Sequence, residues 1–196
     1  MEEYLKMKLV GIVGSLRKES YNRKLLNTVK SLLPEGVDLI DLDYTDVPVF
    51  NQDTEFPTPD SVVRVREAIK EADGVLFFVP EYNQGIPGAL KNVIDWISRP
   101  VNFETMEKVL VGKPAGLMGA TVGVSGTITP QENLRSYLTY MNVHVMPQPR
   151  ATISGVQHKV NEAGELELDD ITLGFVRQTA EAFVEFAKKV NQLEQI

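Results

Sequence analysis

The 196-residue chain contains no cysteine and only two histidines. The absence of cysteine excludes disulfides, thiolate nucleophiles, thiolate-bound zinc and iron–sulfur clusters. The histidines, His144 and His158, have no partner at a metal-ligand spacing, so we expect no metal site. Any redox chemistry must therefore depend on a bound organic cofactor.

The sequence also lacks an excess of basic residues and long hydrophobic runs. The formal net charge is -7, with lysine and arginine scattered along the chain, so nucleic acid is not an expected partner. No stretch approaches the roughly 18 consecutive apolar residues of a membrane span. The charged start of the chain does not resemble a signal peptide. We expect a cytoplasmic protein that does not enter a membrane.

The composition that remains is typical of a globular protein. Hydrophobic residues make up 43% of the chain and charged residues 24%, which is sufficient for one substantial core. No linker, internal repeat or low-complexity segment divides the chain. The sequence therefore predicts a single domain over residues 1–196.

Short apolar runs alternate with segments of helical periodicity along the chain. The predicted strands are residues 7–13, 37–42, 75–79, 114–118 and an edge strand within 143–153. The predicted helices are residues 21–33, about 58–73, 87–97, 130–141 and 170–193. This alternation predicts an α/β fold, a doubly wound five-stranded parallel sheet of order 2-1-3-4-5 with helices on both faces.

In such a sheet, ligands bind outside the carboxyl ends of the strands, at the point where the strand order reverses. Here that point lies between the first and third strands. We therefore expect the loops after Val13, Val79 and Met118 to share one site.

The loop at residues 14–22 has the composition of a phosphate cradle. It precedes a predicted helix, and Ser15, Arg17, Ser20 and Asn22 add donors to the backbone N–H groups. It lacks the Lys-Ser/Thr ending of a Walker loop and the third glycine of a dinucleotide fingerprint, so a terminal monophosphate fits better. The alternative is that Ser20 or Asn22 only caps the helix while Arg17 is solvated.

The loop at residues 80–92 leaves the most hydrophobic strand with two prolines and two glycines. These residues predict a stiff turn on which a flat heterocycle could lie beside Tyr82. The alternative is that Tyr82 packs over the sheet edge, with the prolines only ending the strand and starting the helix.

Together these motifs resemble a known family. Gly-Ser-Leu-Arg-Lys-x-Ser-x-Asn at positions 14–22, Pro-Glu-Tyr-Asn at 80–83 and Pro-Gly-Ala-Leu-Lys-Asn-x-Ile-Asp-Trp at 87–96 are similar to motifs of the NAD(P)H-dependent FMN reductases. That family includes quinone, chromate and azo-dye reductases. The resemblance extends from the first strand to about Met141 and implies a flavodoxin-like fold.

The resemblance also implies roles for particular residues. The FMN phosphate would be bound by Ser15, Arg17, Ser20, Tyr21 and Asn22. The isoalloxazine ring would be lined by Pro80, Glu81, Tyr82, Asn83 and Ile86. The third loop has fewer glycines than is usual in the family, and the residues expected at the far edge of the flavin are Gly119, Ala120 and Gly123.

The implied activity is hydride transfer from NADPH or NADH through bound FMN to small acceptors such as quinones, flavins, azo compounds or chromate, with ping-pong kinetics. Because the flavin carries the chemistry, we expect no catalytic side chain. Family members are usually dimers or tetramers, so we expect a homodimer or homotetramer. Two alternatives stay open: a flavodoxin-type electron carrier, and a nicotinamide-sensing or scaffold protein on the same fold.

Overall fold

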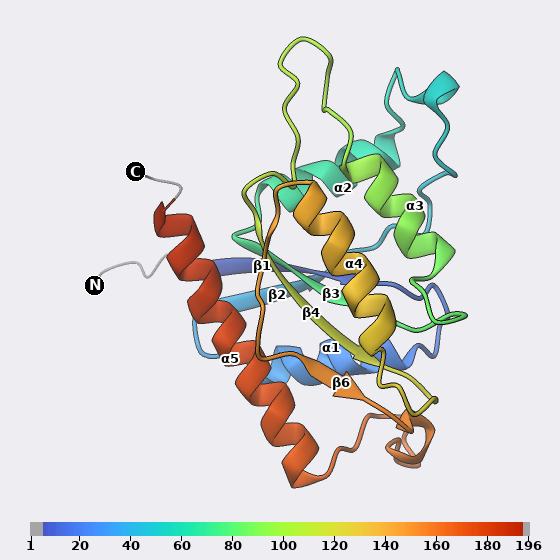
Figure 1. The fold of residues 1–196 in the computed structure, drawn as a ribbon, viewed down its shortest axis with the longest axis vertical. Coiled ribbons are helices and arrows are strands. Elements are labelled where there is room, and N and C mark those ends of the chain that lie inside the picture. Colours follow the sequence, from blue (N-terminus) through green and yellow to red (C-terminus); the bar gives the residue numbers. More distant parts are fainter. Residues whose placement is uncertain (1–5, 194–196) are drawn as a thin grey trace.

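A computed structural model describes residues 6–193 and contains one parallel sheet (Figure 1). The strand order is β2-β1-β3-β4-β5, and a sixth strand, β6, also pairs with β4. The strands are β1 Met7–Val13, β2 Val37–Asp41, β3 Gly74–Phe78, β4 Pro114–Ala120, β5 His144–Val145 and β6 Ala151–Ile153. The predicted fold class and strand order are confirmed.

The predicted edge strand within 143–153 is instead two short strands. β5 pairs with the beginning of β4 at Pro114, and β6 pairs with its end at Met118–Ala120. Pro147 and Pro149 lie between them. Since proline has no N–H to donate to a ladder, the chain leaves the sheet at these positions and then returns.

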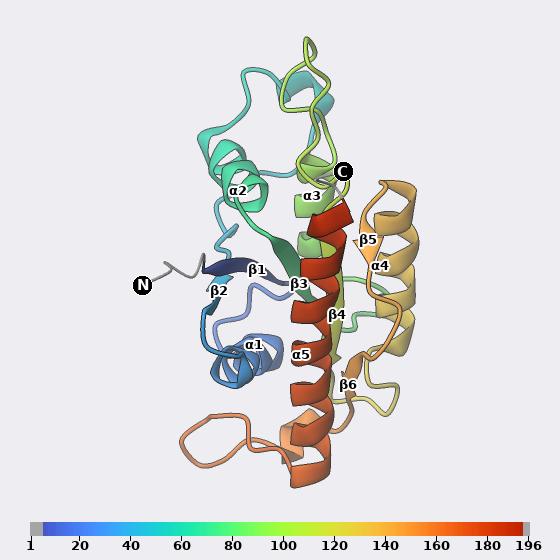
Figure 2. The same ribbon diagram turned by 90° about the vertical axis from the view of Figure 1, so that its left-hand side faces the viewer.

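The helices cover both faces of the sheet (Figure 1). They are α1 Tyr21–Leu32, α2 Asp60–Lys70, α3 Gly88–Ile97, α4 Ile128–Tyr140 and α5 Asp170–Leu193. Buried side chains of α1 and α5 pack with Leu9, Leu76 and Phe78 on one face, while α2, α3 and α4 pack with Val10 and Phe77 on the other. Figure 2 shows α5 crossing the sheet beside β4.

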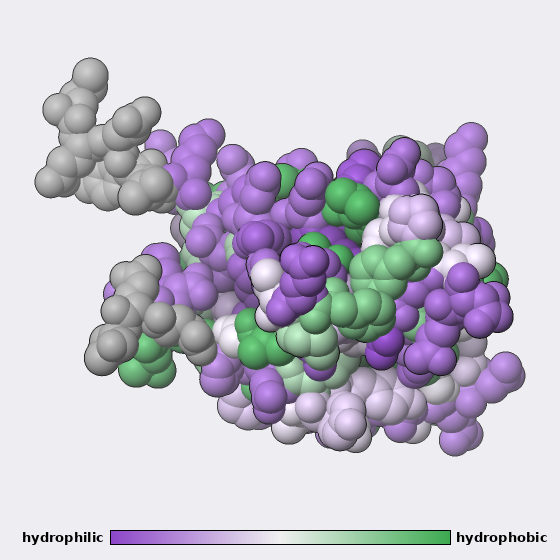
Figure 3. Space-filling model, turned by 90° about the horizontal axis from the view of Figure 1, so that it is seen from above, coloured by the Kyte–Doolittle hydropathy of each residue, from purple (hydrophilic) through white to green (hydrophobic). Residues whose placement is uncertain are grey.

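The upper end of the molecule in Figure 1 carries two long loops, residues 51–59 and 99–113. Phe56 and Phe103 meet there with ring centroids 4.6 Å apart, and both are exposed, as is Met106. Figure 3 looks onto this end and shows apolar side chains gathered among polar ones.

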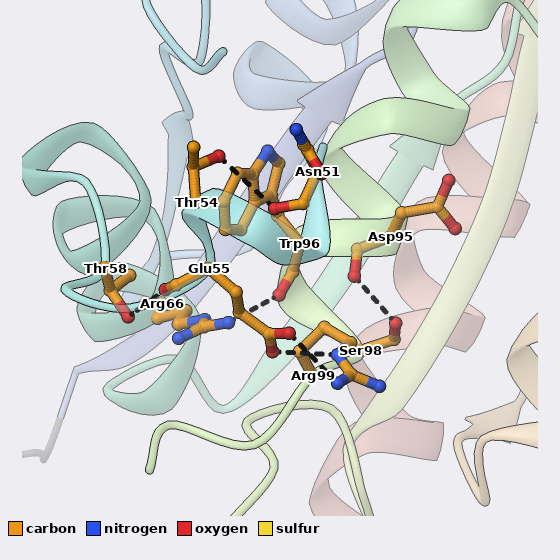
Figure 4. A network of polar contacts seen from close by, with 9 residues as sticks. All are labelled: Asn51, Thr54, Glu55, Thr58, Arg66, Asp95, Trp96, Ser98 and Arg99. Atoms are coloured by element: carbon orange, nitrogen blue, oxygen red, sulfur yellow. Dashed lines mark hydrogen bonds and ion pairs between the residues drawn. The ribbon is translucent and has the colours of Figure 1, made fainter. Parts of the chain in front are cut away.

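The loop between β2 and α2 is fastened to α3 (Figure 4). The buried Glu55 carboxylate accepts two hydrogen bonds from Arg99, at 2.8 and 3.0 Å. The Trp96 indole N–H donates to Pro48 O (2.8 Å), and Trp96 O accepts from Arg66 (2.8 Å). Trp96 is fully buried, which agrees with a packing role.

Candidate functional site

A cavity of about 170 Å³ lies at the carboxyl ends of β1, β3 and β4. It is lined by all five predicted phosphate residues, by Pro80, Glu81 and Tyr82 of the second loop, and by three residues of the third loop: Ser15, Arg17, Ser20, Tyr21, Asn22, Pro80, Glu81, Tyr82, Ala120, Thr121 and Val122. The fold thus brings the three predicted loops together at the reversal of strand order.

The first loop presents buried hydroxyl groups. Ser20 is 2% exposed and caps α1, because its Oγ accepts from the Arg23 N–H (3.4 Å). Ser15 is 6% exposed, and its Oγ accepts from the Arg17 N–H (3.3 Å). Among residues 6–193, neither hydroxyl hydrogen has an acceptor. Each serine can therefore still donate to a bound anion, so capping and anion binding are compatible.

The charge of this loop is positive where it faces the cavity. The Arg17 guanidinium donates to Glu19 O and lies over the Tyr21 ring, 4.8 Å from its centroid. The Glu19 carboxylate is paired with Lys24 (2.9 Å), and this hydrogen bond lowers the pKa of Glu19. Because Lys24 neutralises the acid, Arg17 is left as a cation at the rim, beside the amino end of α1.

The second loop contains a two-residue turn closed by two hydrogen bonds. Tyr82 N–H donates to Gly85 O (3.1 Å), and Gly85 N–H donates to Tyr82 O (3.0 Å). Asn83 and Gln84 have φ of 52° and 58°, as a type I′ turn requires. The turn holds Tyr82, which is 52% exposed, at the cavity rim.

Two residues predicted for the ring do not line the cavity. Asn83 is exposed at the tip of the turn, and Ile86 packs partly buried against the core. In the third loop, Gly119 and Gly123 also lie outside the lining. A Cβ on Gly119 would lie 2.2 Å from Thr127 Oγ1 and 2.4 Å from Val79 O. Close packing is therefore sufficient reason for glycine at position 119.

Three contributors were missed from the sequence. Thr121 and Val122 line the cavity, and their position directly after β4 was the only available signal. Tyr44 follows β2, and its hydroxyl donates to Val13 O (2.6 Å) at the end of β1. Burial raises the pKa of Tyr44, so the hydroxyl remains a donor. No sequence motif indicates this contact between Tyr44 and Val13.

The second and third loops are also joined directly. Ser125 Oγ donates to the Glu81 carboxylate across the mouth of the site. Among the described residues, no cluster of three or more histidine, aspartate or glutamate side chains could hold a metal ion, and no helix is long and apolar enough to cross a membrane.

The strand order and the position of the site define a flavodoxin-like protein. The family model of the NADPH-dependent FMN reductases matches residues 7–158, so the chain belongs to that family and is an oxidoreductase. An NAD(P)H-dependent FMN reductase of Pseudomonas aeruginosa is 37% identical over 186 residues, covering 94% of this chain and 97% of the relative. The quinone reductase of Escherichia coli K12 is 34% identical, covering 95% and 98%.

Solved structures agree with this assignment. The flavoenzyme NAD(P)H:(acceptor) oxidoreductase FerB from Paracoccus denitrificans superposes with a TM-score of 0.83 at 33% identity, covering 93% of this chain and 98% of that one. Oxidised flavodoxin 1 from Bacillus cereus has a TM-score of 0.57 at 15% identity, a likeness that concerns the fold alone.

The cavity residues fit FMN, the cofactor of the family. Buried hydroxyls with free hydrogens, an exposed guanidinium and a helix amino end are the donors that a terminal phosphate requires. Ligand pockets usually enclose about 300–1,000 Å³. A cavity of about 170 Å³ therefore holds only part of such a molecule, and the rest must lie over the open surface beside Tyr82 and Val122.

Proposed function

We propose that this enzyme binds FMN by its phosphate in the 14–22 loop and catalyses hydride transfer from NADPH or NADH to small quinones. The observation that carries the proposal is the pairing of Ser15, Ser20 and Arg17 with the stiff 82–85 turn in one cavity. Bound FMN supplies the redox chemistry. The protein contributes binding, orientation and access, and no side chain is needed as an acid or base.

The charges around the site favour neutral acceptors. Glu81 is the only charged residue in the 80–87 and 119–128 loops, and the chain carries a net charge of -7. An oxyanion such as chromate is repelled by this field, whereas a quinone is not. Relatives named 2-hydroxy-1,4-benzoquinone reductase (Burkholderia) and quinone reductase support the same choice. Free flavins, azo compounds and chromate complete the panel of acceptors to assay.

We propose ping-pong kinetics. The cavity opens beside Tyr82 and Val122, and one open surface suits a nicotinamide and an acceptor binding in turn. Initial rates at several acceptor concentrations should give parallel double-reciprocal lines. Intersecting lines would require both substrates to bind together.

An absorption spectrum of the FMN-loaded protein, taken without oxygen before and after one equivalent of NADPH, tests the activity. We expect rapid loss of the flavin band and its return when a quinone is added. A flavin that stays oxidised would identify an electron carrier of the flavodoxin type. A protein that cannot be loaded with flavin would favour a sensor or scaffold.

We propose that the enzyme is a homodimer or homotetramer that associates through α3 and α4. A cavity of about 660 Å³ lies between these helices and includes Ile94, Leu110 and Tyr137. Tyr140, at the end of α4, is 90% exposed. The lining also contains Lys91, Asp95 and Arg99, and a mixture of exposed apolar and polar side chains is typical of contacts between subunits.

Light scattering after gel filtration tests the assembly. Tyr140→Ser should lower the molar mass, while Ile171→Ser, on α5 and also exposed, should leave it unchanged. A wild-type monomer would contradict the proposal.

We also propose that the enzyme acts in the cytoplasm, where its reduced nicotinamide substrate is produced. Cell fractionation should recover the NADPH-dependent quinone reductase activity with cytoplasmic markers. Recovery with the membrane or secreted fraction would contradict this location.

A further inference from the structure

Strand β3 ends earlier than strand β4, so the last residues of β4, beside the site, are not paired with β3. Val79 N–H donates to Met118 O (2.8 Å), but β3 ends at Phe78 and the chain from Pro80 onward leaves the sheet. Backbone groups of alternate strand residues point to the same side, so Ala120 faces β3 as Met118 does. Without another partner, the buried N–H and C=O of Ala120 would be left unsatisfied.

The side chain of Asn22 supplies that partner. Its Nδ2 donates to Ala120 O (2.8 Å), and its Oδ1 accepts from Ala120 N–H (3.0 Å). One donor and one acceptor on a single amide reproduce what a strand residue would offer. Asn22 is only 3% exposed, so these two contacts account for its orientation.

The two sides of this contact differ in how firmly they are held. Asn22 belongs to α1, which is anchored in the core by Leu25, Leu26 and Val29. Ala120 leads into residues 121–127, a loop in which Val124 is 99% exposed. Loss of the contact should therefore displace the loop rather than the helix.

We propose that Asn22 is a positioning residue, which replaces β3 beside Ala120 and holds the third loop against the flavin site, and that it is not a ligand of the phosphate. This inference rests on the proposed FMN site. It gives Asn22 a different role from that of Ser20 and Arg17, although all three belong to one sequence motif. Thr121 and Val122, directly after Ala120, line the cavity and would be misplaced without it.

Riboflavin lacks the phosphate and so distinguishes the two roles. A phosphate ligand contributes to FMN binding only, whereas a residue that positions the third loop contributes equally to both flavins. Asn22→Ala should weaken FMN and riboflavin by a similar factor, about tenfold for the lost contact. The ratio of the two dissociation constants should stay within about threefold of the wild-type ratio.

Asn27→Ala is the matched control, because Asn27 is an exposed asparagine on the same helix. Both flavins should bind this variant as they bind the wild type. Weaker FMN binding with unchanged riboflavin binding in Asn22→Ala would make Asn22 a phosphate ligand and overturn the proposal. Unchanged binding of both flavins would also overturn it.

Hydrogen exchange of the flavin-free protein gives a second readout. The amide of Ala120 should exchange faster in Asn22→Ala than in Asn27→Ala, and unchanged protection would contradict the proposal. Asn22→Ser, which can keep one of the two hydrogen bonds, should show a smaller increase and serves if the alanine variant does not fold. A wild-type protein that binds neither flavin would defeat the proposed function but leave this exchange test intact.

Discussion

Ser20 shows how one small side chain can serve both stability and binding. Its oxygen caps α1 through the Arg23 N–H, while its hydrogen has no acceptor among residues 6–193. The hydroxyl lines the cavity. The same hydroxyl group can therefore cap the helix and bind an anion, which is why the sequence allowed both interpretations.

Substitutions at position 20 can separate the two tasks. Ser20→Ala should lower the free energy of unfolding by about 1 kcal/mol, the usual value of an N-cap, and weaken FMN about tenfold. Ser20→Asp should retain the cap and the stability, since aspartate is a good N-cap, yet repel the phosphate. Urea denaturation and FMN titration measure the two effects. Equal FMN affinity in Ser20→Asp and wild type would exclude phosphate binding at this loop.

Tyr44 stabilises the end of β1 at the residue scale. Tyr44→Phe removes the donor to Val13 O and leaves that buried carbonyl unpaired, which should cost about 1–3 kcal/mol in urea denaturation. In the flavin-free protein, Tyr82→Phe, at a tyrosine that is 52% exposed, should leave the free energy of unfolding unchanged. A Tyr44→Phe variant as stable as wild type would mean that water replaces the hydroxyl.

Individual site residues differed in how well the sequence predicted them. Ser15, Arg17 and Ser20 line the cavity, and they are predicted from the sequence because a strand-to-helix loop concentrates donors in a recognisable order. Val122 was missed because an exposed valine after a strand carries no chemical signal. Asn22 also lines the cavity, but no sequence pattern indicates its contact with Ala120, because Ala120 contributes only backbone atoms.

At the scale of elements, glycines test how tightly the strands and loops pack. Gly119→Ala should destabilise the protein by about 1–3 kcal/mol, because its Cβ overlaps Thr127 and Val79. Gly174→Ala, within α5 and with no atom near its Cβ, should stabilise it by about 0.5–1 kcal/mol. Thermal or urea unfolding compares them. A neutral Gly119→Ala would show that the third loop can shift freely.

Helices were predicted well where their ends carry local signals. α1 begins after its serine cap, and α5 spans the predicted residues 170–193. α4 begins at Ile128, two residues before the proline expected to start it, because proline is tolerated within a first turn. Pro147 and Pro149 indicate a break in the edge strand, but the pairing of β6 with the end of β4 depends on which part of β4 remains unpaired, and a single sequence does not show this.

At the scale of the whole molecule, two hydrophobic clusters share one sheet. β1 contributes Val10 and Ile12 to one cluster and Leu9 and Val13 to the other. Because the same strands belong to both, neither should persist without the other. We therefore propose one cooperative domain and expect a single thermal transition with equal calorimetric and van't Hoff enthalpies. Two separate transitions would show that the chain contains two units that unfold independently.

In the function proposed for this protein, the loop after β1 binds the doubly charged phosphate of FMN. A phosphate monoester takes up its second proton near a pKa of about 6. Cationic and N–H donors around the dianion should hold that pKa lower in the bound state, so protonation should begin only at more acidic pH.

Phosphorus NMR of the FMN-loaded protein between pH 8 and pH 5 measures this directly. We expect the resonance of bound FMN to keep its dianion position down to about pH 5, while free FMN titrates near pH 6. A bound resonance that titrates together with free FMN would show that Ser15, Arg17 and Ser20 do not hold the phosphate.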